Sequence, residues 1–339
     1  MKTRRLRLTT SGLPTDPALL EAAGILRRGG LVAFPTETVY GLGANALNPE
    51  AIEKIFAAKQ RPHWDPVIVH IANVVAARAL TLTWPDSAAR LAEAFWPGPL
   101  TMLLPRSQRV PALCTAGRDK VGLRMPAHPV ALALIAAAGV PVAAPSANRF
   151  GHTSPTTAAH VLADLDGRID AILDAGSCDV GVESTVLDPT TDPPIIYRPG
   201  GISPEQIRRI LGNVTVAERK ISDEAPPESL ESPGLGIRHY APRARLILVE
   251  SEAELHLTIS REAPGHRVGV LLPSDWAAPS ENVSVFIWGT WSQPESLARD
   301  LYQQLRALDD LGVDVIVCPL PPPAGIGLAV RDRLRKAAR

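Results

Sequence analysis

The sequence predicts an α/β protein in which a twisted, open sheet of mixed strand direction packs against helices and a smaller parallel-sheet domain follows. The first observation is that short apolar runs alternate with amphipathic segments through the first half of the chain. The second is that this alternation stops over residues 222–236, where Pro, Glu, Ser and Gly dominate, and then resumes. A length of 339 residues with 45% hydrophobic residues suits two domains. We expect the first domain at 14–212, a linker at 213–242 and the second domain at 243–339.

Residues that start and end helices locate the helices of the first domain. Pro17 suits the first turn of a helix that Gly29 ends, and Asn48 precedes a second helix whose apolar residues share one face. Ser203 and Gln206 form a capping box for a later helix. Further helices are expected at 87–95, 129–138 and 156–165, and strands at 31–34, 67–71, 101–104, 121–125, 142–144, 171–173, 185–187 and 195–197.

Strand-like runs alternate with helical segments in the second domain as well. Strands are expected at 246–249, 268–272, 283–288 and 313–318, and the clearest helices at 296–308 and 328–338. This β-α alternation predicts a small parallel sheet.

Charge and cysteine content exclude several classes of protein. The 35 Lys and Arg residues balance the 35 Asp and Glu residues, whereas proteins that bind a nucleic-acid backbone usually carry a basic excess. Direct nucleic-acid binding is therefore expected to be weak or absent. The three cysteines, Cys114, Cys178 and Cys318, are far apart, which disfavours disulfides and a zinc cluster and suits the reducing cytoplasm. No apolar run has the form of a signal peptide or the length of a membrane span.

Polar clusters at the ends of predicted strands are the candidates for chemistry, because α/β sheets place ligands there. The cluster at 35–43 follows a buried strand, and it is either a small-ligand site or an ordinary strand-to-helix turn whose threonines satisfy the backbone. The cluster at 59–62 follows a helix, so its two cations either complement the helix dipole or contact phosphates. His70, at the end of the next strand, is either a hydrogen-bonded structural residue or a ligand-binding one, and the sequence does not decide its charge.

A charged residue and a further hydroxyl complete the candidates. Arg124 lies inside an apolar strand, and a buried arginine is costly unless a carboxylate from a ligand or from the protein pairs with it. Ser154 is interpreted as a helix N-cap, and the helix N-terminus there would also attract an anion. Other polar clusters follow strands at 144–148, 183–185 and 197–201.

Together these clusters predict one polar, cation-rich concavity. Its positive charge comes from Lys59, Arg61, Lys120, Arg124 and Arg198, and its hydroxyls come from Thr38, Ser146, Ser154 and Ser184. Such a site suits a polyanion beside a small carboxylate ligand, for example a nucleotide beside an amino acid. We find no Ser-His-Asp triad and no paired acid-base carboxylates, so catalysis is expected to depend on positioning and charge stabilisation, as in nucleotidyl transfer.

The ordered set of motifs resembles the YrdC-like domain from about residue 17 to residue 202. The motifs are FPTETVYGLG at 34–43, KQRP at 59–62, VH at 69–70, LRMP at 123–126, APSAN at 144–148 and EST at 183–185. The residues SPG at 232–234 and RHYAP at 238–242, with the second domain, resemble the long two-domain L-threonylcarbamoyladenylate synthases. The resemblance implies a YrdC-like catalytic domain and a small Rossmann-like C-terminal domain.

The resemblance also implies a reaction. L-threonine, bicarbonate and ATP give threonylcarbamoyl-AMP and pyrophosphate, with Mg²⁺ accompanying ATP. Partner proteins then transfer the threonylcarbamoyl group to the adenosine next to the anticodon of tRNA. Two alternatives stay open. One is an RNA-binding protein on the same fold, which zero net charge disfavours, and the other is a carbamoyl transferase like the hydrogenase-maturation proteins, whose zinc-finger cysteines this chain lacks.

The resemblance carries roles over to particular residues. The threonine pocket would be lined by Thr38, His70, Arg124, Ala144 and Ser184, with Arg124 binding the carboxylate. ATP would be contacted by Arg61, Asp65, Lys120, Ser146, Ser154, Arg198 and Tyr240. Lys59, beside the phosphates, and Arg61 are expected to be catalytic, and no residue is assigned to a metal. The segment that ends near Tyr240 is expected to close over the nucleotide as a lid, the alternative being a simple spacer between domains.

Overall fold

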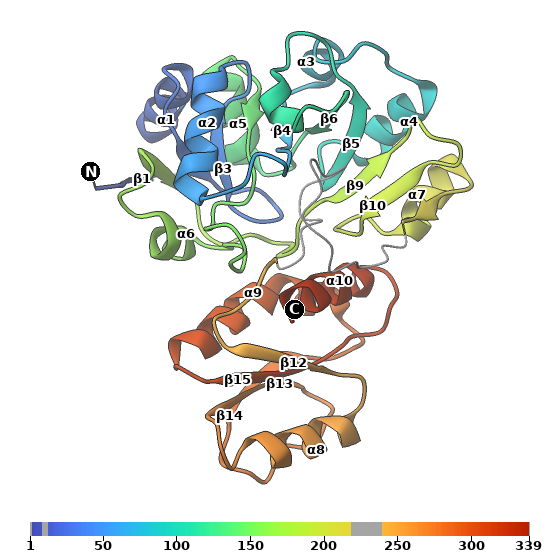
Figure 1. The fold of residues 1–339 in the computed structure, drawn as a ribbon. Helices are drawn as coiled ribbons and strands as arrows, with labels where there is room; N and C mark the ends of the chain where they lie inside the picture. The colour runs from blue at the N-terminus through green and yellow to red at the C-terminus, as the bar shows by residue number, and fades with distance from the viewer. Residues whose placement is uncertain (1, 9–12, 218–238, 339) are drawn as a thin grey trace.

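Two sheets, one of eleven strands and one of four, organise the protein, and each has its own helices (Figure 1). The computed structural model describes residues 2–8, 13–217 and 239–338. Residues 218–238 of the linker expected at 213–242 lie outside the described residues, as does most of the expected lid. The predicted fold, a mixed α/β sheet followed by a smaller parallel sheet, is confirmed.

The larger sheet has the strand order β1-β8-β2-β3-β7-β4-β6-β5-β9-β10-β11. Its strands are β1 (Arg4–Arg7), β2 (Val32–Phe34), β3 (Gly41–Asn45), β4 (Val69–His70), β5 (Leu100–Pro105), β6 (Lys120–Arg124), β7 (Val142–Ala143), β8 (Ala171–Asp174), β9 (Thr185–Asp188), β10 (Ile195–Arg198) and β11 (Thr215–Val216). The helices of this part are α1 (Pro17–Arg27), α2 (Pro49–Lys59), α3 (Val74–Arg78), α4 (Asp86–Phe95), α5 (Pro129–Ala138), α6 (Ala158–Leu165) and α7 (Pro204–Leu211), with short 3-10 turns at Leu13–Thr15 and Ala112–Thr115. We call the elements from β1 to β11 the N-terminal domain.

Helices pack on both faces of the larger sheet, whose strands run in mixed directions. For example, β2 is antiparallel to β3 but parallel to β8, and β4 is parallel to β6 but antiparallel to β7. Alternate residues of a strand point to opposite faces, and β2 shows this clearly. Ala33 packs in one core with apolar residues of α2, α4 and α6, whereas Val32 and Phe34 pack in another core with α1 and α5.

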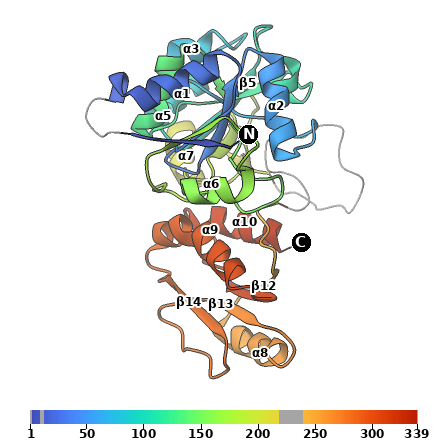
Figure 2. The same ribbon diagram turned by 90° about the vertical axis from the view of Figure 1, so that its left-hand side faces the viewer.

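The smaller sheet is parallel throughout and forms the C-terminal domain, the elements from β12 to α10. Its strands are β12 (Arg245–Val249), β13 (Val268–Pro273), β14 (Ser284–Gly289) and β15 (Val315–Pro319), in the order β12-β15-β13-β14. Helix α8 (Glu252–Glu262) lies on its far side, whereas α9 (Pro294–Asp310) and α10 (Gly327–Ala337) lie between this sheet and the N-terminal domain (Figures 1 and 2). Val39 and Val182 of the N-terminal domain share one apolar core with Tyr302 of α9, so the two domains are packed together.

The segment 35–43 is not a strand-to-helix turn, which was one of the two interpretations that the sequence left open. The chain instead reverses, and β3 pairs antiparallel with β2. Gly43 permits the close packing, because a Cβ atom there would lie 2.8 Å from Phe34 Cε1 and 2.9 Å from Val142 Cγ1. Glycine and other small residues give little apolar alternation, which is why β3 was not predicted.

Besides β3, four elements were not predicted from the sequence: β1, α3, β11 and α8. The two strands are short and contain one apolar residue each, and they exist because a neighbouring strand supplies their hydrogen bonds. Arg4 pairs with Ala171 of β8, and Thr215 pairs with Ile195 of β10. Both extend the larger sheet beyond residues 14–212, and the three domain ranges given above stay a prediction.

Candidate functional site

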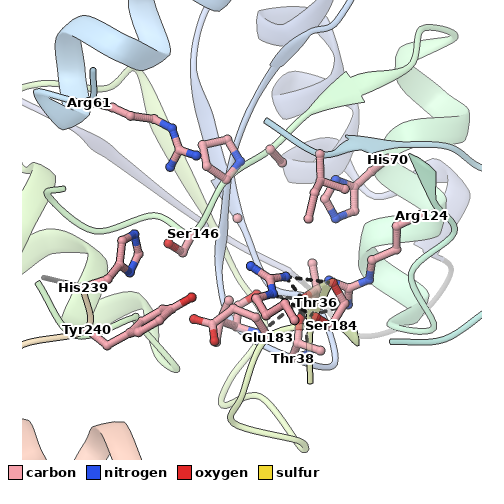
Figure 3. A pocket seen from close by; sticks show the side chains of 16 residues that line it. Thr36, Thr38, Arg61, His70, Arg124, Ser146, Glu183, Ser184, His239 and Tyr240 are labelled. Atoms are coloured by element: carbon pink, nitrogen blue, oxygen red, sulfur yellow. Dashed lines mark hydrogen bonds between the residues drawn. The ribbon is translucent and has the colours of Figure 1, made fainter. Parts of the chain in front are cut away.

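A pocket lies beside β4 and β6 and is lined by residues that follow β2 and β7 and by His239 and Tyr240, the first residues described after residue 217 (Figure 3). Nine residues assigned to the site from the sequence line it, namely Thr38, Arg61, His70, Arg124, Ala144, Ser146, Ser184, Arg198 and Tyr240. Four others, Lys59, Asp65, Lys120 and Ser154, are not part of the lining. The predicted concavity therefore exists, with some of its expected members around it rather than in it.

Arg124, on β6, is buried, and the protein itself supplies a carboxylate partner for it. Its Nη2 atom lies 2.7 Å from Glu37 Oε1 and donates a hydrogen bond to Thr38 Oγ1 at 2.9 Å. Its Nε atom has no hydrogen-bond partner among the described residues. The sequence left open whether the carboxylate that pairs with Arg124 comes from the protein or from a ligand. The protein supplies one, and the Nε donor remains available for a hydrogen bond to a ligand.

The threonines after β2 serve the backbone and the pocket at once. Thr36 Oγ1 donates to Val39 O at 2.6 Å, which is the backbone role that the turn interpretation predicts. The same oxygen lies 2.9 Å from Thr38 Oγ1. Thr38 is fully buried and contacts Arg124, so it presents its hydroxyl in a fixed position.

His70, on β4, is neutral at physiological pH. Burial, assisted by the neighbouring charge of Arg124, lowers its pKa to about 3. Its ring lies perpendicular to that of Phe34, with the centroids 6.4 Å apart. The low pKa answers the question of the charge of His70 that the sequence left open. The neutral ring gives the pocket an uncharged, polar wall.

Ser184 and Arg198 bind each other where β9 begins and β10 ends. Arg198 Nη2 donates to Ser184 O at 3.0 Å and to Ser184 Oγ at 3.2 Å. The Ser184 hydroxyl also lies 2.8 Å from Thr101 Oγ1. The pair brings a buried guanidinium to the wall of the pocket.

Arg61 lies across the pocket from Arg124 (Figure 3), and Asp65 holds it from behind. Arg61 Nε donates to Asp65 O at 3.0 Å and Nη2 donates to Pro66 O at 2.6 Å. The Nη2 atom is also 2.9 Å from Asp65 Oδ2. Because Asp65 is fully buried, it orients the Arg61 guanidinium rather than lining the pocket.

Lys59, at the end of α2, is buried behind the loop that carries Ser146. Its Nζ atom donates to Ser146 O at 2.6 Å and to Asn148 O at 2.5 Å. Burial and the nearby Arg61 charge hold the pKa of Lys59 well below its usual value. The lysine therefore fixes the Ser146 loop against the pocket.

Lys120 and Ser154 make contacts that the sequence did not predict. Lys120 Nζ lies 2.5 Å from Asp188 Oδ2, away from the pocket lining. Ser154 Oγ donates to Glu183 Oε1 at 2.5 Å. The interpretation of Ser154 as a helix N-cap is wrong, because α6 begins further along the chain and Thr157 caps it.

Seven of the residues that line the pocket were not assigned to it from the sequence, and two of these, Glu183 and His239, are titratable. Each of the two belongs to a motif noted in the sequence, EST at 183–185 or RHYAP at 238–242, and is adjacent to an assigned residue, Ser184 or Tyr240. Burial, with the neighbouring positive charges, holds the pKa of His239 well below its usual value, so its ring is neutral. Residues next to the assigned ones in these motifs therefore also line the pocket.

Tyr240 is placed in the pocket by contacts with the C-terminal domain. Its ring stacks on that of Tyr302, with centroids 5.9 Å apart and an interplanar angle of 26°. The guanidinium carbon of Arg333 lies 5.2 Å from the centre of the same ring. Tyr240 also has a positive φ of 66°, an uncommon conformation for a residue other than glycine.

Positively charged side chains outnumber carboxylates in the lining of the pocket. Arg61, Arg124 and Arg198 line it, and Glu183 is the one carboxylate among the lining residues that the structure describes. Asp65 and Glu37 pair with two of these arginines from outside the lining. Within residues 2–8, 13–217 and 239–338, no group of three His, Cys, Asp or Glu side chains is arranged to hold a metal ion. None of the described helices is both long and apolar enough to cross a bilayer. The arrangement suits small anionic ligands.

Comparison with known protein families identifies the class of this protein. Residues 24–200 match the Sua5_yciO_yrdC family, described as "Telomere recombination", and residues 202–339 match the Sua5_C family, described as the C-terminal domain of threonylcarbamoyl-AMP synthase. The fold and the pocket thus define a two-domain α/β protein of the Sua5 type.

Full-length relatives specify the family further. A threonylcarbamoyl-AMP synthase of Bacillus subtilis is 46% identical over 343 residues, covering 100% of this chain and 98% of the relative, and one of Pyrococcus abyssi is 44% identical over 94% of this chain and 93% of the relative. The crystal structure of P. abyssi Sua5 complexed with L-threonine superposes with a TM-score of 0.90 at 42% identity, covering 100% of this chain and 98% of that one. The chain belongs to the threonylcarbamoyl-AMP synthase family. The family predicted from the motifs is confirmed, and with it the function as an enzyme that makes threonylcarbamoyl-AMP.

Proposed function

We propose that the pocket joins L-threonine, bicarbonate and ATP to form threonylcarbamoyl-AMP and pyrophosphate. The observation that carries this proposal is that the spare Nε donor of Arg124 shares one buried pocket with the guanidinium groups of Arg61 and Arg198. A guanidinium with a free donor suits a carboxylate, and further guanidiniums suit a polyphosphate. An amino acid and a nucleotide therefore find complementary charge side by side.

Threonine is proposed to bind at the ends of the paired strands β4 and β6, where His70 and Arg124 line the pocket. Arg124 holds its carboxylate, and Thr38 and Ser184 offer hydroxyls to its polar groups. Neutral His70 adds no charge that would repel the amine. Ala144 contributes only a methyl group to the lining, which leaves space for a small side chain.

ATP is proposed to occupy the other side of the pocket, in direct contact with Arg61, Ser146, Arg198 and Tyr240. Residues behind this surface act on ATP through their neighbours: Asp65 orients Arg61, Lys59 fixes the Ser146 loop, and Ser154 binds Glu183. Lys120 pairs with Asp188 outside the lining, and its ATP contact stays a prediction from the resemblance.

The reaction then needs positioning and charge stabilisation rather than a protein nucleophile. The amine of threonine and bicarbonate give a carbamate and water, and a carbamate oxygen attacks the α-phosphorus of ATP in line. The bond to the β-phosphate oxygen breaks, and pyrophosphate leaves with its charge opposite the arginines. The described part of the chain offers no acidic cluster for a resident Mg²⁺, so Mg²⁺ is proposed to arrive with ATP as part of the substrate, held by phosphate oxygens and water.

The direct test is pyrophosphate release from ATP with L-threonine and bicarbonate each omitted in turn. Release is expected to require both. L-serine is expected to substitute poorly, because it lacks the methyl group that packs against the lining, and one methyl is worth on the order of tenfold in such pockets. Release at the same rate without threonine would refute the proposal.

The wider role of the chain is proposed as the first step of a tRNA modification in the cytoplasm. Partner proteins would transfer the threonylcarbamoyl group to the adenosine next to the anticodon. The balance of 35 basic and 35 acidic residues supports weak direct tRNA binding by this chain. A labelled product that reaches tRNA only when partner proteins are added would bear this out.

A further inference from the structure

The buried carboxylate of Glu183 lies between the two domains and receives three side-chain donors. Ser154 Oγ donates to Oε1 at 2.5 Å, the Tyr302 hydroxyl donates to Oε2 at 3.1 Å, and Arg333 Nε donates to Oε2 at 2.7 Å. Ser154 belongs to the N-terminal domain, whereas Tyr302 lies on α9 and Arg333 on α10. Two of the three donors that orient a pocket-lining carboxylate therefore come from the C-terminal domain.

Arg333 contacts three segments of the pocket wall with one guanidinium. Its side chain is fully buried, its Nη2 atom donates to Pro199 O at 2.9 Å, and its guanidinium carbon lies 5.2 Å from the centre of the Tyr240 ring. Pro199 directly follows Arg198, which lines the pocket. Figure 3 shows Glu183 and Tyr240 on one side of the pocket. The arginine thus links the segments that carry Glu183, Arg198 and Tyr240.

Electrostatics make this arrangement sensitive to the loss of one partner. Burial alone would raise the pKa of Glu183, but the charges of Arg333 and Arg198 and the hydrogen bond from Ser154 hold it below its usual value. The ionised carboxylate accepts all three hydrogen bonds. Without Arg333, a buried negative charge loses its main partner, and movement of Glu183 toward another donor would displace Ser184 beside it.

We propose that Arg333 and Tyr302 are positioning residues of the active site, through which the C-terminal domain sets the placement of Glu183, Ser184 and Arg198 for ligand binding. The proposal rests on the function proposed for the pocket. It makes the C-terminal domain part of the active-site wall rather than a separate module.

The test uses the full chain with Arg333→Gln and Tyr302→Phe. Arg331→Gln is the matched control, because Arg331 is also a buried arginine of α10 but donates to Pro321 O at 2.8 Å and to Glu250 within the C-terminal domain. Titration calorimetry with L-threonine and with ATP gives affinities, and thermal unfolding gives stability. Arg333→Gln is expected to weaken both ligands by about tenfold or more, Tyr302→Phe by a smaller factor of about threefold, and Arg331→Gln by less than about twofold.

A double variant separates positioning from general destabilisation. In Glu183→Gln with Arg333→Gln, the unpaired buried charge is gone, so the combined loss of affinity is expected to be smaller than the product of the two single losses. Unchanged affinities in a folded Arg333→Gln variant, or equal losses in Arg333→Gln and Arg331→Gln, would overturn the proposal. If Arg333→Gln does not fold, Tyr302→Phe decides alone, and wild-type affinities there count against positioning. If the wild type shows no threonine-dependent pyrophosphate release, the proposed function is refuted. The positioning proposal is judged separately, from the ratios of variant to wild-type affinity.

Discussion

Three buried arginines line the pocket, and other groups of the protein hold each of them in place. Asp65 and backbone carbonyls hold Arg61, Glu37 and Thr38 hold Arg124, and Ser184 holds Arg198. A buried guanidinium is costly unless its charge and its donors are satisfied. These partners keep the arginines in the pocket in the absence of ligand charge and fix the directions in which they meet a ligand.

Substitution of single arginines is predicted to separate the two ligands. Arg61→Ala should mainly weaken ATP binding and Arg124→Ala should mainly weaken threonine binding, because the two side chains lie across the pocket from each other (Figure 3). A charge-assisted hydrogen bond contributes roughly 1.5–3 kcal/mol, so each loss should be on the order of tenfold or more. Calorimetric titration of both variants with both ligands measures this. Two folded variants that lose both ligands equally would contradict these roles.

The neutral His70 predicts a pH dependence of stability. Its pKa of about 3 in the folded protein lies below the ordinary value of 6.5, so the unfolded chain binds the proton first as the pH falls. The stability that neutral His70 contributes is present above pH 6.5 and is lost progressively between pH 6.5 and about 3. At pH 5 this amounts to about 2 kcal/mol relative to pH 7.

The measurement is urea unfolding of the wild type and of His70→Gln at pH 7 and pH 5. The wild type should lose about 2 kcal/mol more between these pH values than the variant does. His63→Gln, at an exposed histidine whose ring contacts Glu53, serves as the control. The same pH dependence in wild type and His70→Gln would show that His70 is not the group that titrates.

At the level of elements, prediction succeeded where the determining residues are close in sequence. Asn48 caps α2, and Ser203 with Gln206 forms the predicted capping box of α7. Local signals of this kind do not report pairing between distant segments. The edge strands β1 and β11 depend on neighbours far along the chain, and β3 depends on the space that Gly43 leaves beside Phe34.

In the candidate site, too, local motifs predicted residues correctly, whereas contacts between distant parts of the chain were not predicted. Residues within compact polar motifs, such as Thr38 and Arg124, were predicted to line the pocket, and they do. The groups that orient Glu183 escaped prediction because Tyr302 and Arg333 follow it by 119 and 150 residues. Whether a lysine such as Lys120 faces the pocket or an acid beside it is likewise decided by tertiary contacts, here with Asp188.

The close approach of two loops next to β9 and β10 leads to a prediction at Gly200. A Cβ atom at this position would overlap the backbone at Thr185 N and Glu183 O. Gly200→Ala should therefore push the segment that carries Ser184 out of place, destabilise the fold by about 1–3 kcal/mol and weaken threonine binding.

Gly265→Ala is the matched control for this substitution, because nothing lies within 4 Å of a Cβ atom there. Urea unfolding and threonine titration of both variants provide the measurements. Wild-type stability and threonine affinity in Gly200→Ala would mean that the loops separate without cost, contrary to the packing.

The whole molecule brings its two domains together at the pocket. Helices α9 and α10 lie between the two sheets (Figures 1 and 2), and they supply the side chains that contact Glu183 and Tyr240. The chain therefore reaches the C-terminal domain by way of the pocket, since His239 and Tyr240 line it before β12 begins. The segment that joins the two domains therefore ends beside the pocket proposed to bind the ligands.

This placement sharpens the prediction that the segment before Tyr240 is a lid. Residues 222–236 are rich in Pro, Glu, Ser and Gly and have few apolar residues with which to pack. A lid over the nucleotide would keep water from a product that hydrolyses easily. A spacer between domains would need neither the aromatic ring of Tyr240 nor its position in the pocket.

Limited proteolysis with a glutamate-specific protease distinguishes a lid from a spacer, because Glu224, Glu228 and Glu231 all lie in this segment. A lid should be cleaved more slowly when threonine and ATP are both present than when either is absent. Tyr240→Ala should then release free AMP or lose synthesis, because the closed segment no longer excludes water. Threonine alone is the control, since a lid over the nucleotide should respond little without ATP. Equal cleavage rates with and without both substrates, together with full activity of Tyr240→Ala, would leave only the spacer.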